Sequence, residues 1–147
     1  MRMAAKGCAL REKLRPGLQS LSGGDRQKVV KESRRFATDS MSFDEVMPNA
    51  PTFDYLIGTR TSADLVVALE IHPATSSEVQ RMLQKQEQTK PTLERFGCGL
   101  CSVDAWIWVS SGSVDLPYTS PKRRLLADKR ILGPHGRVDL RNPTGLP

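Results

Sequence analysis

Hydrophobic and polar positions along the chain predict several strands around one very apolar segment. Residues 65–72 (LVVALEIH) form a nearly continuous hydrophobic run, which is typical of a central strand covered on both faces. Residues 53–57 and 103–110 are rich in aromatic and β-branched side chains and predict two more strands. Residues 42–47 and 137–140 predict a short strand and an edge strand.

Three other segments carry the spacing or the capping signals of helices. Asp25 can cap a helix over residues 26–38, in which apolar side chains recur on one side at the helical period. Residues 75–96 open with TSSE, a hydroxyl followed three positions later by a carboxylate, which is typical of a helix start. Ser120 can cap a basic helix over residues 122–129. The order helix, strands, helix, strand, helix predicts an α/β fold with a mixed central β-sheet flanked by helices.

Length and composition suit a single folded unit. The 147 residues are 38% hydrophobic and 26% charged, as in one compact domain. Residues 1–24 hold no sustained period, so we expect a flexible basic arm, then a single α/β domain over residues 25–140 and an irregular tail over residues 141–147. The longest apolar runs span five residues, against about 20 for a bilayer-spanning helix, so no membrane contact is expected. Without a secretory signal, we expect a cytoplasmic protein.

Charge is distributed in three blocks. Residues 1–39 hold ten lysines and arginines against four acids, residues 40–118 five against ten, and residues 119–147 seven against two. Basic flanks around an acidic centre suit an enzyme acting on phosphodiesters, in which cations bind the polyanion and acids hold metal ions. The candidate phosphate-contacting residues are Lys28, Lys31, Arg35, Lys122, Arg123 and Arg124. The alternative is an ordinary solvated surface.

An ionisable pair ends the most hydrophobic segment. Glu70 and His72 stand two positions apart, so in a strand both side chains emerge on the same face. Burying ionisable groups is costly without a partner or a metal ion, which predicts that this strand end opens on a cleft. Asp54, on the preceding strand, can meet Glu70 there. Two carboxylates near one histidine predict a site for Mg²⁺ or Mn²⁺, whose bound water is the nucleophile, and no organic cofactor is expected.

This arrangement resembles the PD-(D/E)XK nuclease family, the core shared by many restriction-type endonucleases, over residues 25–109. The resemblance implies a restriction endonuclease-like sandwich and metal-dependent hydrolysis of nucleic acid. By position, Asp54 and Glu70 would hold the ion, and Glu32 would be the supporting acid on the first helix. His72 stands where the family has lysine. We expect a nucleic acid as the partner, and a homodimer is compatible with the sequence.

The histidine leaves several interpretations open. Lysine is a permanent cation that can orient water and offset phosphate charge, whereas histidine is mostly neutral near pH 7 unless nearby acids raise its pKa. His72 can replace lysine in part, take a proton from the water, ligate the metal, or mark a nuclease fold that has lost activity and binds nucleic acid or protein. The structural alternatives are a His72 ring bonded to a backbone carbonyl and salt bridges from Asp54 or Glu70 to Arg60, Lys85 or another base.

Three smaller motifs favour structural explanations. Cys98 and Cys101 have the spacing of half a zinc site, but the sequence offers no second pair, which favours two buried thiols. Trp106 and Trp108 share a strand face and are expected in the core or at a partner contact. Residues 110–113 (SSGS) lack the lysine and spacing of a phosphate-binding loop and predict a turn.

Overall fold

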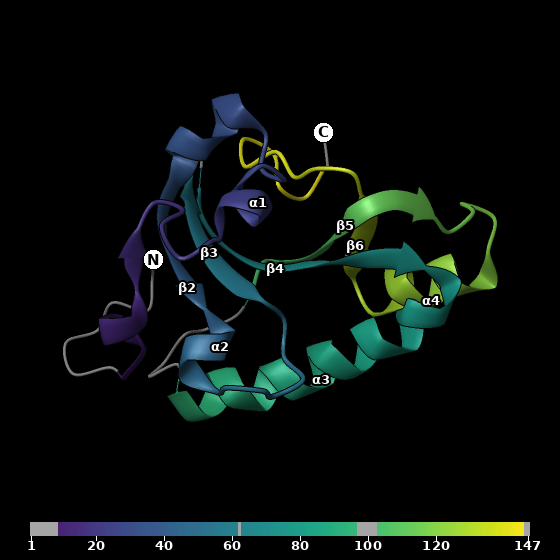
Figure 1. Cartoon of the computed structure of the whole chain (residues 1–147), viewed down its shortest axis with the longest axis horizontal. Helices are drawn as coiled ribbons and strands as arrows, with labels where there is room; N and C mark the ends of the chain where they lie inside the picture. Colours follow the sequence, from purple (N-terminus) through teal and green to yellow (C-terminus); the bar gives the residue numbers. More distant parts are fainter. Residues whose placement is uncertain (1–8, 62, 97–102, 146–147) are drawn as a thin grey trace.

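A six-stranded mixed sheet forms the centre of the protein, with its strands adjacent in chain order (Figure 1). The computed structural model describes residues 9–61, 63–96 and 103–145. The strands are β1 (Arg15–Pro16), β2 (Ala37–Ser42), β3 (Tyr55–Arg60), β4 (Asp64–Thr75), β5 (Ala105–Asp115) and β6 (Ile131–His135). The first four strands pair antiparallel, whereas β5 runs parallel to β4 and β6 runs parallel to β5. Each parallel pair therefore needs a crossover connection.

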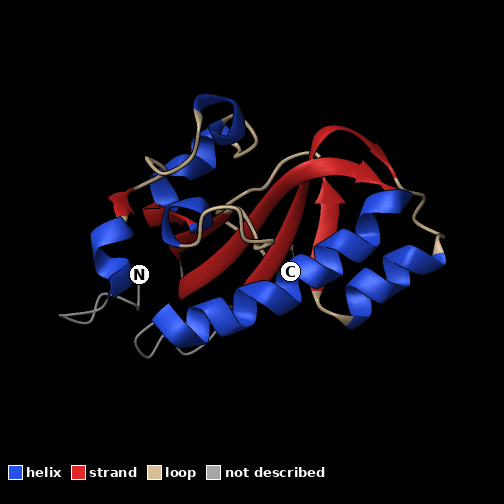
Figure 2. Cartoon of the chain, turned by 60° about the horizontal axis from the view of Figure 1, so that its bottom comes forward, coloured by secondary structure: helices blue, strands red, loops and turns tan. Residues whose placement is uncertain are grey.

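Two α-helices make these crossovers. α3 (Val79–Phe96) joins β4 to β5, α4 (Pro121–Asp128) joins β5 to β6, and Figure 2 shows both on the same face of the sheet. The short helical segments are η1 (Ala9–Lys13), α1 (Gly23–Arg26), η2 (Lys31–Phe36), α2 (Phe43–Val46) and η3 (Ser76–Glu78), where η marks a 3-10 helix. None of the helices in the described part of the chain has the length and apolar character that crossing a bilayer requires.

Alternation along the central strands builds one hydrophobic core on each face of the sheet. Under α3 and α4, Ala68 of β4 and Trp108 of β5 pack with Met82 of α3. On the opposite face, Leu69 packs with Val138 and with other residues from both ends of the chain. The predicted α/β class with a mixed sheet is confirmed, and both tryptophans are buried in the core.

The strongest strand predictions are confirmed, but both strands are longer than expected. β4 continues past Pro73, which is exposed, and the pairing with β5 shifts register between His72 and Ala74. A proline is compatible with a strand at such an irregularity because it has no N–H to donate. β5 runs on to Asp115, so residues 110–113 belong to a strand and the predicted turn is wrong.

The helix predicted over residues 26–38 is wrong. Only α1 and η2 form there, and β2 begins at Ala37. Between α1 and η2, Val29 makes a parallel bridge with Val138, and the Val30 N–H donates to the Val138 carbonyl oxygen at 2.9 Å. Consecutive β-branched valines suit this extended pairing better than a helix interior.

The strand predicted over residues 42–47 is a helical turn instead. α2 occupies Phe43–Val46, with Asp44 and Glu45 in its first turn, where the positive end of a helix favours acids. The side chain of Phe43 is buried in the core under α3. The neighbouring strand β3 begins at Tyr55, two residues later than predicted.

Both ends of the described chain also differ from the predictions. Residues 9–24 include η1 and β1, and Leu10, Leu18 and Leu21 are buried, so the expected flexible arm does not extend over these residues. The last strand is β6, and residues 137–140 contribute only the single bridge of Val138 rather than an edge strand.

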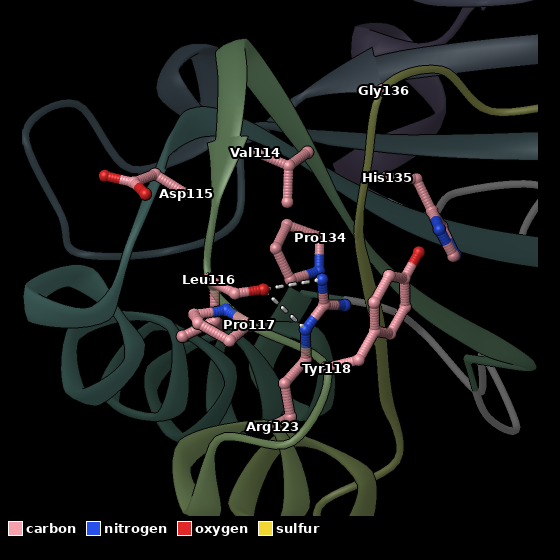
Figure 3. Close-up of a pocket in the computed structure, with 9 residues that line it drawn as sticks. All are labelled: Val114, Asp115, Leu116, Pro117, Tyr118, Arg123, Pro134, His135 and Gly136. Atoms are coloured by element: carbon pink, nitrogen blue, oxygen red, sulfur yellow. Dashed lines mark hydrogen bonds between the residues drawn. The ribbon is translucent and has the colours of Figure 1, made fainter.

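The basic helix α4 is confirmed with its predicted cap. Ser120 Oγ accepts from the Lys122 N–H at 3.2 Å. Arg123 Nε and Nη2 both donate to the Leu116 carbonyl oxygen, at 3.2 and 3.0 Å, and tie the helix to the segment that follows β5 (Figure 3).

Candidate functional site

Backbone hydrogen bonds hold the segment that carries Asp54. The Phe53 N–H donates to Thr89 Oγ1 on α3 at 2.9 Å, and the Asp54 carbonyl oxygen accepts from the Phe43 N–H of α2 at 2.9 Å. The side-chain Oδ2 of Asp54 accepts from the Ile71 N–H of β4 at 3.0 Å. Asp54 therefore lies where α2, α3 and β4 meet, directly before β3.

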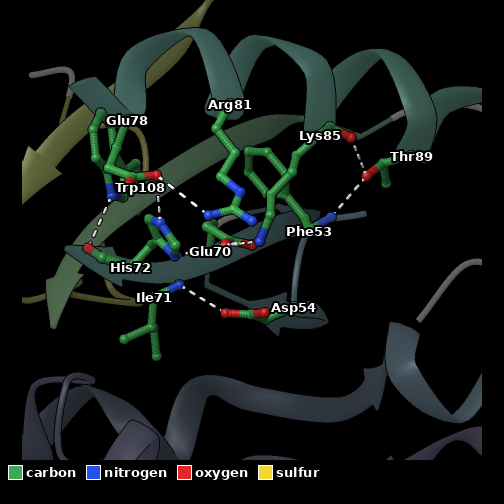
Figure 4. A network of polar contacts seen from close by, with 10 residues as sticks. All are labelled: Phe53, Asp54, Glu70, Ile71, His72, Glu78, Arg81, Lys85, Thr89 and Trp108. Atoms are coloured by element: carbon green, nitrogen blue, oxygen red, sulfur yellow. Dashed lines mark hydrogen bonds and ion pairs between the residues drawn. The ribbon is translucent and has the colours of Figure 1, made fainter. Parts of the chain in front are cut away.

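Glu70 lies on β4 and points toward α3 (Figure 4). Ala68 belongs to the core under α3 and Leu69 to the opposite core, so alternation turns Glu70 to the helix side. Glu70 is 0% exposed, and its Oε1 forms an ion pair with Nζ of Lys85 on α3. The alternative prediction of a salt bridge between Glu70 and Lys85 is confirmed. The expectation that this carboxylate opens on a cleft is wrong, because the helix covers it.

A polar pocket of about 270 Å³ borders this ion pair. Asp54, Asp44 and Lys85 are among the residues that line it, and Glu70 is not. Lys85 thus contacts the buried Glu70 and also borders the pocket that Asp54 reaches. Desolvation raises the pKa of both carboxyls, and the positive charge of Lys85 opposes part of that rise.

Burial opposes ionisation of both acids. Desolvation and, second, the negative charge of Asp54 raise the pKa of Glu70 to about 8 against the effect of Lys85. Desolvation also raises the pKa of Asp54 against the hydrogen bond from Ile71. Glu70 Oε2 is buried and makes no hydrogen bond of ordinary distance and angle, and the nearby Asp54 N–H opposes only part of the rise in the pKa of Glu70. A cation between the two acids would satisfy this oxygen and relieve their repulsion.

The raised pKa of Glu70 predicts how stability changes with pH. The folded protein keeps the Glu70 proton while the unfolded chain has already lost it, so the stabilisation is complete at acidic pH and disappears as pH rises through about 8. In urea denaturation from about pH 5 to pH 8, we expect the free energy of unfolding to fall by up to about 1.4 kcal/mol per pH unit relative to Glu70→Gln. Glu87→Gln, an exposed acid of α3, is the control. Parallel pH profiles for the wild type and Glu70→Gln would contradict the raised pKa.

His72 lies between two glutamates. Its Nε2 is 2.7 Å from Glu78 Oε2, and its Nδ1 is 3.8 Å from Glu70 Oε1. The hydrogen bond from His72 lowers the pKa of Glu78, so Glu78 is a carboxylate at neutral pH and Nε2 donates the proton. The His72 carbonyl oxygen accepts from Trp108 Nε1 at 3.1 Å. The ring therefore binds carboxylates rather than the backbone carbonyl that the structural alternative predicted.

Glu32 does not join this cluster. It is exposed on η2, and its charge acts on Arg141. The acid that approaches from the N-terminal part of the chain is Asp25 of α1, which accepts from Tyr55 Oη at 2.6 Å and whose charge raises the pKa of Asp54. The position predicted for a supporting acid was wrong because the long helix that would have carried Glu32 is replaced by α1 and η2.

The six predicted phosphate-contacting residues fall in two regions. They are Lys28, Lys31 and Arg35 around α1 and η2, and Lys122, Arg123 and Arg124 on α4. Lys122 Nζ donates to the Ser76 carbonyl oxygen at 2.9 Å, which places α4 beside η3, the segment that carries Glu78. The α4 group is therefore close to the His72 end of the site.

Two carboxylates, rather than a larger cluster, are available for a cation. In the described ranges, no group of three or more His, Cys, Asp or Glu side chains converges in a metal-binding arrangement. Mg²⁺ is commonly held by one or two protein carboxylates, with water and substrate phosphates as its other ligands. Asp54, which lines the pocket, and Glu70, whose Oε2 makes no hydrogen bond, are the two carboxylates that would have to meet this smaller requirement. The cysteine motif is not tested here, since Cys8, Cys98 and Cys101 lie outside the described residues.

Comparison with known proteins identifies no relative. No protein-family model, curated protein or solved structure matches the chain. The function is therefore inferred from the geometry and charge of the site.

Lys85 is the site residue that the sequence pattern did not single out for chemistry. It appeared only as one of several salt-bridge partners, although it lies beside Gln86, which is 1% exposed, and four residues before Thr89, which is fully buried. Polar side chains at buried positions of an amphipathic helix are the signal that could have identified it.

Proposed function

We propose that the protein is a divalent-metal-dependent hydrolase of nucleic-acid phosphodiesters. The observation that carries the proposal is that Lys85 of α3 pairs with Glu70 of β4 and also lines, with Asp54, one polar pocket. One buried oxygen of Glu70 makes no hydrogen bond of ordinary distance and angle. Two acids and a permanent cation are the groups that a metal ion and a scissile phosphate require.

The order of the elements supports the finer fold assignment, a restriction endonuclease-like sandwich. β2, β3 and β4 form an antiparallel meander, α3 crosses over the sheet, and β5 pairs in parallel with β4. In the PD-(D/E)XK family the first acid lies on a strand before the one that bears the glutamate. Here Glu70 lies on β4, and Asp54 lies one residue before the start of β3 rather than on the strand.

Each side chain has a distinct role in the proposed mechanism. Asp54 and Glu70 would hold Mg²⁺ or Mn²⁺, which supplies charge neutralisation and an activated water when bound. Lys85 provides the permanent positive charge that histidine lacks, and it borders the pocket where the phosphate would lie. Glu78 holds the His72 ring through Nε2, which places Nδ1 3.8 Å from Glu70 Oε1.

The direct test is cleavage of labelled single-stranded DNA, duplex DNA and RNA by the purified full chain. We expect products with Mg²⁺ or Mn²⁺ and none in excess chelator. Titration of Mn²⁺ by calorimetry gives a second readout, in which one ion binds the wild type. Cleavage that persists in chelator would refute the proposal. So would the absence of cleavage of every one of the three substrates with both metals.

A second candidate function is a nuclease-fold protein that binds nucleic acid or protein without catalysis. The full burial of Glu70 and its ion pair with Lys85 favour this candidate, because a carboxylate already paired with a buried cation does not require a metal ion. Binding of nucleic acid that weakens steeply with salt, with no turnover, would support the nucleic-acid form. Association with a protein partner that is insensitive to salt would support the other form.

A further inference from the structure

An exposed tyrosine stands between β5 and α4, away from the acid cluster. Tyr118 is 88% exposed, although aromatic rings are usually at least partly buried. The guanidinium carbon of Arg123 lies 4.4 Å from the centre of its ring (Figure 3). One face of the ring is thus supported by a cation, and its exposure leaves the other face open to solvent.

The cation that supports the ring is itself held in place. Arg123 Nε and Nη2 both donate to the Leu116 carbonyl oxygen. The Ser120 N–H donates to the Pro117 carbonyl oxygen at 3.0 Å and closes the turn that carries Tyr118. Because the turn and the arginine already restrict the ring, Tyr118 would lose little conformational entropy when a ligand stacks on it.

Two hollows flank this surface, and Tyr118 and Arg123 line both of them. One has a volume of about 430 Å³ and also includes His135, and the other has a volume of about 610 Å³ and includes Arg124 and Arg130. Residues 119–137 contain six lysines and arginines against one acid. The larger hollow therefore combines an open aromatic face with three arginines and no acid among the described residues that line it, which is complementary to a polyanion, whereas Asp115 lines the smaller one together with Arg123.

We propose that Tyr118 and Arg123 form a stacking platform for an unpaired base of single-stranded nucleic acid, with Arg124 and Arg130 contacting the flanking phosphates. Single-strand binding sites pair aromatic stacking with a positively charged groove, whereas the bases of a duplex are stacked on one another and cannot reach a ring. The proposal deepens the proposed function by naming the form of the bound polyanion. It does not itself require cleavage.

Fluorescence anisotropy with a labelled single-stranded oligonucleotide of about 12 nucleotides tests the platform on the full chain without added metal. We expect Tyr118→Ala to weaken binding about tenfold and Tyr118→Phe to bind nearly as the wild type does. Leu125→Ala, at a residue of α4 that is 48% exposed, is the matched control and should not change the affinity. Arg124→Gln should weaken binding and reduce the slope of log affinity against log salt by about 1.

Three results would overturn the platform: unchanged affinity in Tyr118→Ala, an equal loss in Tyr118→Phe and Tyr118→Ala, or binding of duplex without binding of single strands. Displacement of the oligonucleotide by polyglutamate at equal charge would also overturn it, since charge alone would then explain binding. Tyr118→Ala removes an exposed ring, so an unchanged melting temperature is expected and separates lost binding from lost folding. Binding that depends on Tyr118 without cleavage would sustain the platform and refute the hydrolase. Cleavage together with binding that does not depend on Tyr118 would refute the platform and sustain the hydrolase.

Discussion

Replacing Asp54 by asparagine should reduce metal-dependent cleavage by about a thousandfold, since several kcal/mol of charge stabilisation at about 1.4 kcal/mol per tenfold would be lost. The amide retains the size of the side chain and an oxygen that can accept from the Ile71 N–H. It removes the negative charge that would hold the cation. Initial rates at saturating Mn²⁺ measure the effect, and calorimetry should show that Mn²⁺ binding is also weakened.

Two control variants make this result specific. Glu87→Gln removes an exposed acid of α3 and should leave the rate near that of the wild type. Glu32→Gln tests the placement of the supporting acid, and because Glu32 is exposed on η2 it should also leave the rate unchanged. Full activity of Asp54→Asn with an intact fold would eliminate the two-carboxylate mechanism.

Near pH 9, Lys85→Met should lower the free energy of unfolding by about 3–5 kcal/mol, because it leaves the ionised, buried Glu70 without its cation. Methionine retains much of the aliphatic stem, so the loss reports mainly the charge. We expect a larger effect near pH 9, where Glu70 is ionised, than near pH 5, where it carries a proton. Urea denaturation at the two pH values measures the difference.

The exposed Lys90 of α3 provides the matched control. Lys90→Met removes an ion pair of 3.8 Å with Glu87 at the surface, and its effect should stay below about 1 kcal/mol. Combining Glu70→Gln with Lys85→Met should recover much of the lost stability, because no buried charge remains. Equal effects of Lys85→Met and Lys90→Met, or no recovery in the double variant, would show that the buried pair carries little energy.

Local sequence patterns predicted secondary structure correctly where a segment is buried on both faces or where an adjacent residue caps a helix. The hydrophobic run of β4 and the aromatic run of β5 can only be covered inside a sheet, and the cap of α4 is made by the adjacent Ser120. The helix expected over residues 26–38 failed because Val29 pairs with Val138, far away in the chain. Periodicity within a short window cannot detect such a partner.

Some residues of the candidate site could be predicted from local patterns, and others depend on contacts between distant segments. Antiparallel neighbours bring Asp54 near β4, and the two-residue spacing turns Glu70 and His72 to one face, so these three residues could be predicted from the sequence. The contribution of Lys85 depends on how α3 rotates over the sheet, which the packing of Met82 and Leu93 in the core under α3 determines. That packing also buries Glu70 completely.

The sequence by itself therefore determined the α/β class, the central strands, the capped basic helix and Glu70 on the central strand, because each follows from burial or hydrogen bonding among nearby residues. Only the tertiary structure decided that Lys85 pairs with Glu70, that Glu32 lies elsewhere and that Tyr118 faces solvent beside Arg123. These features depend on helix rotation and on contacts between distant segments, and the free energy of packing the whole chain selects them.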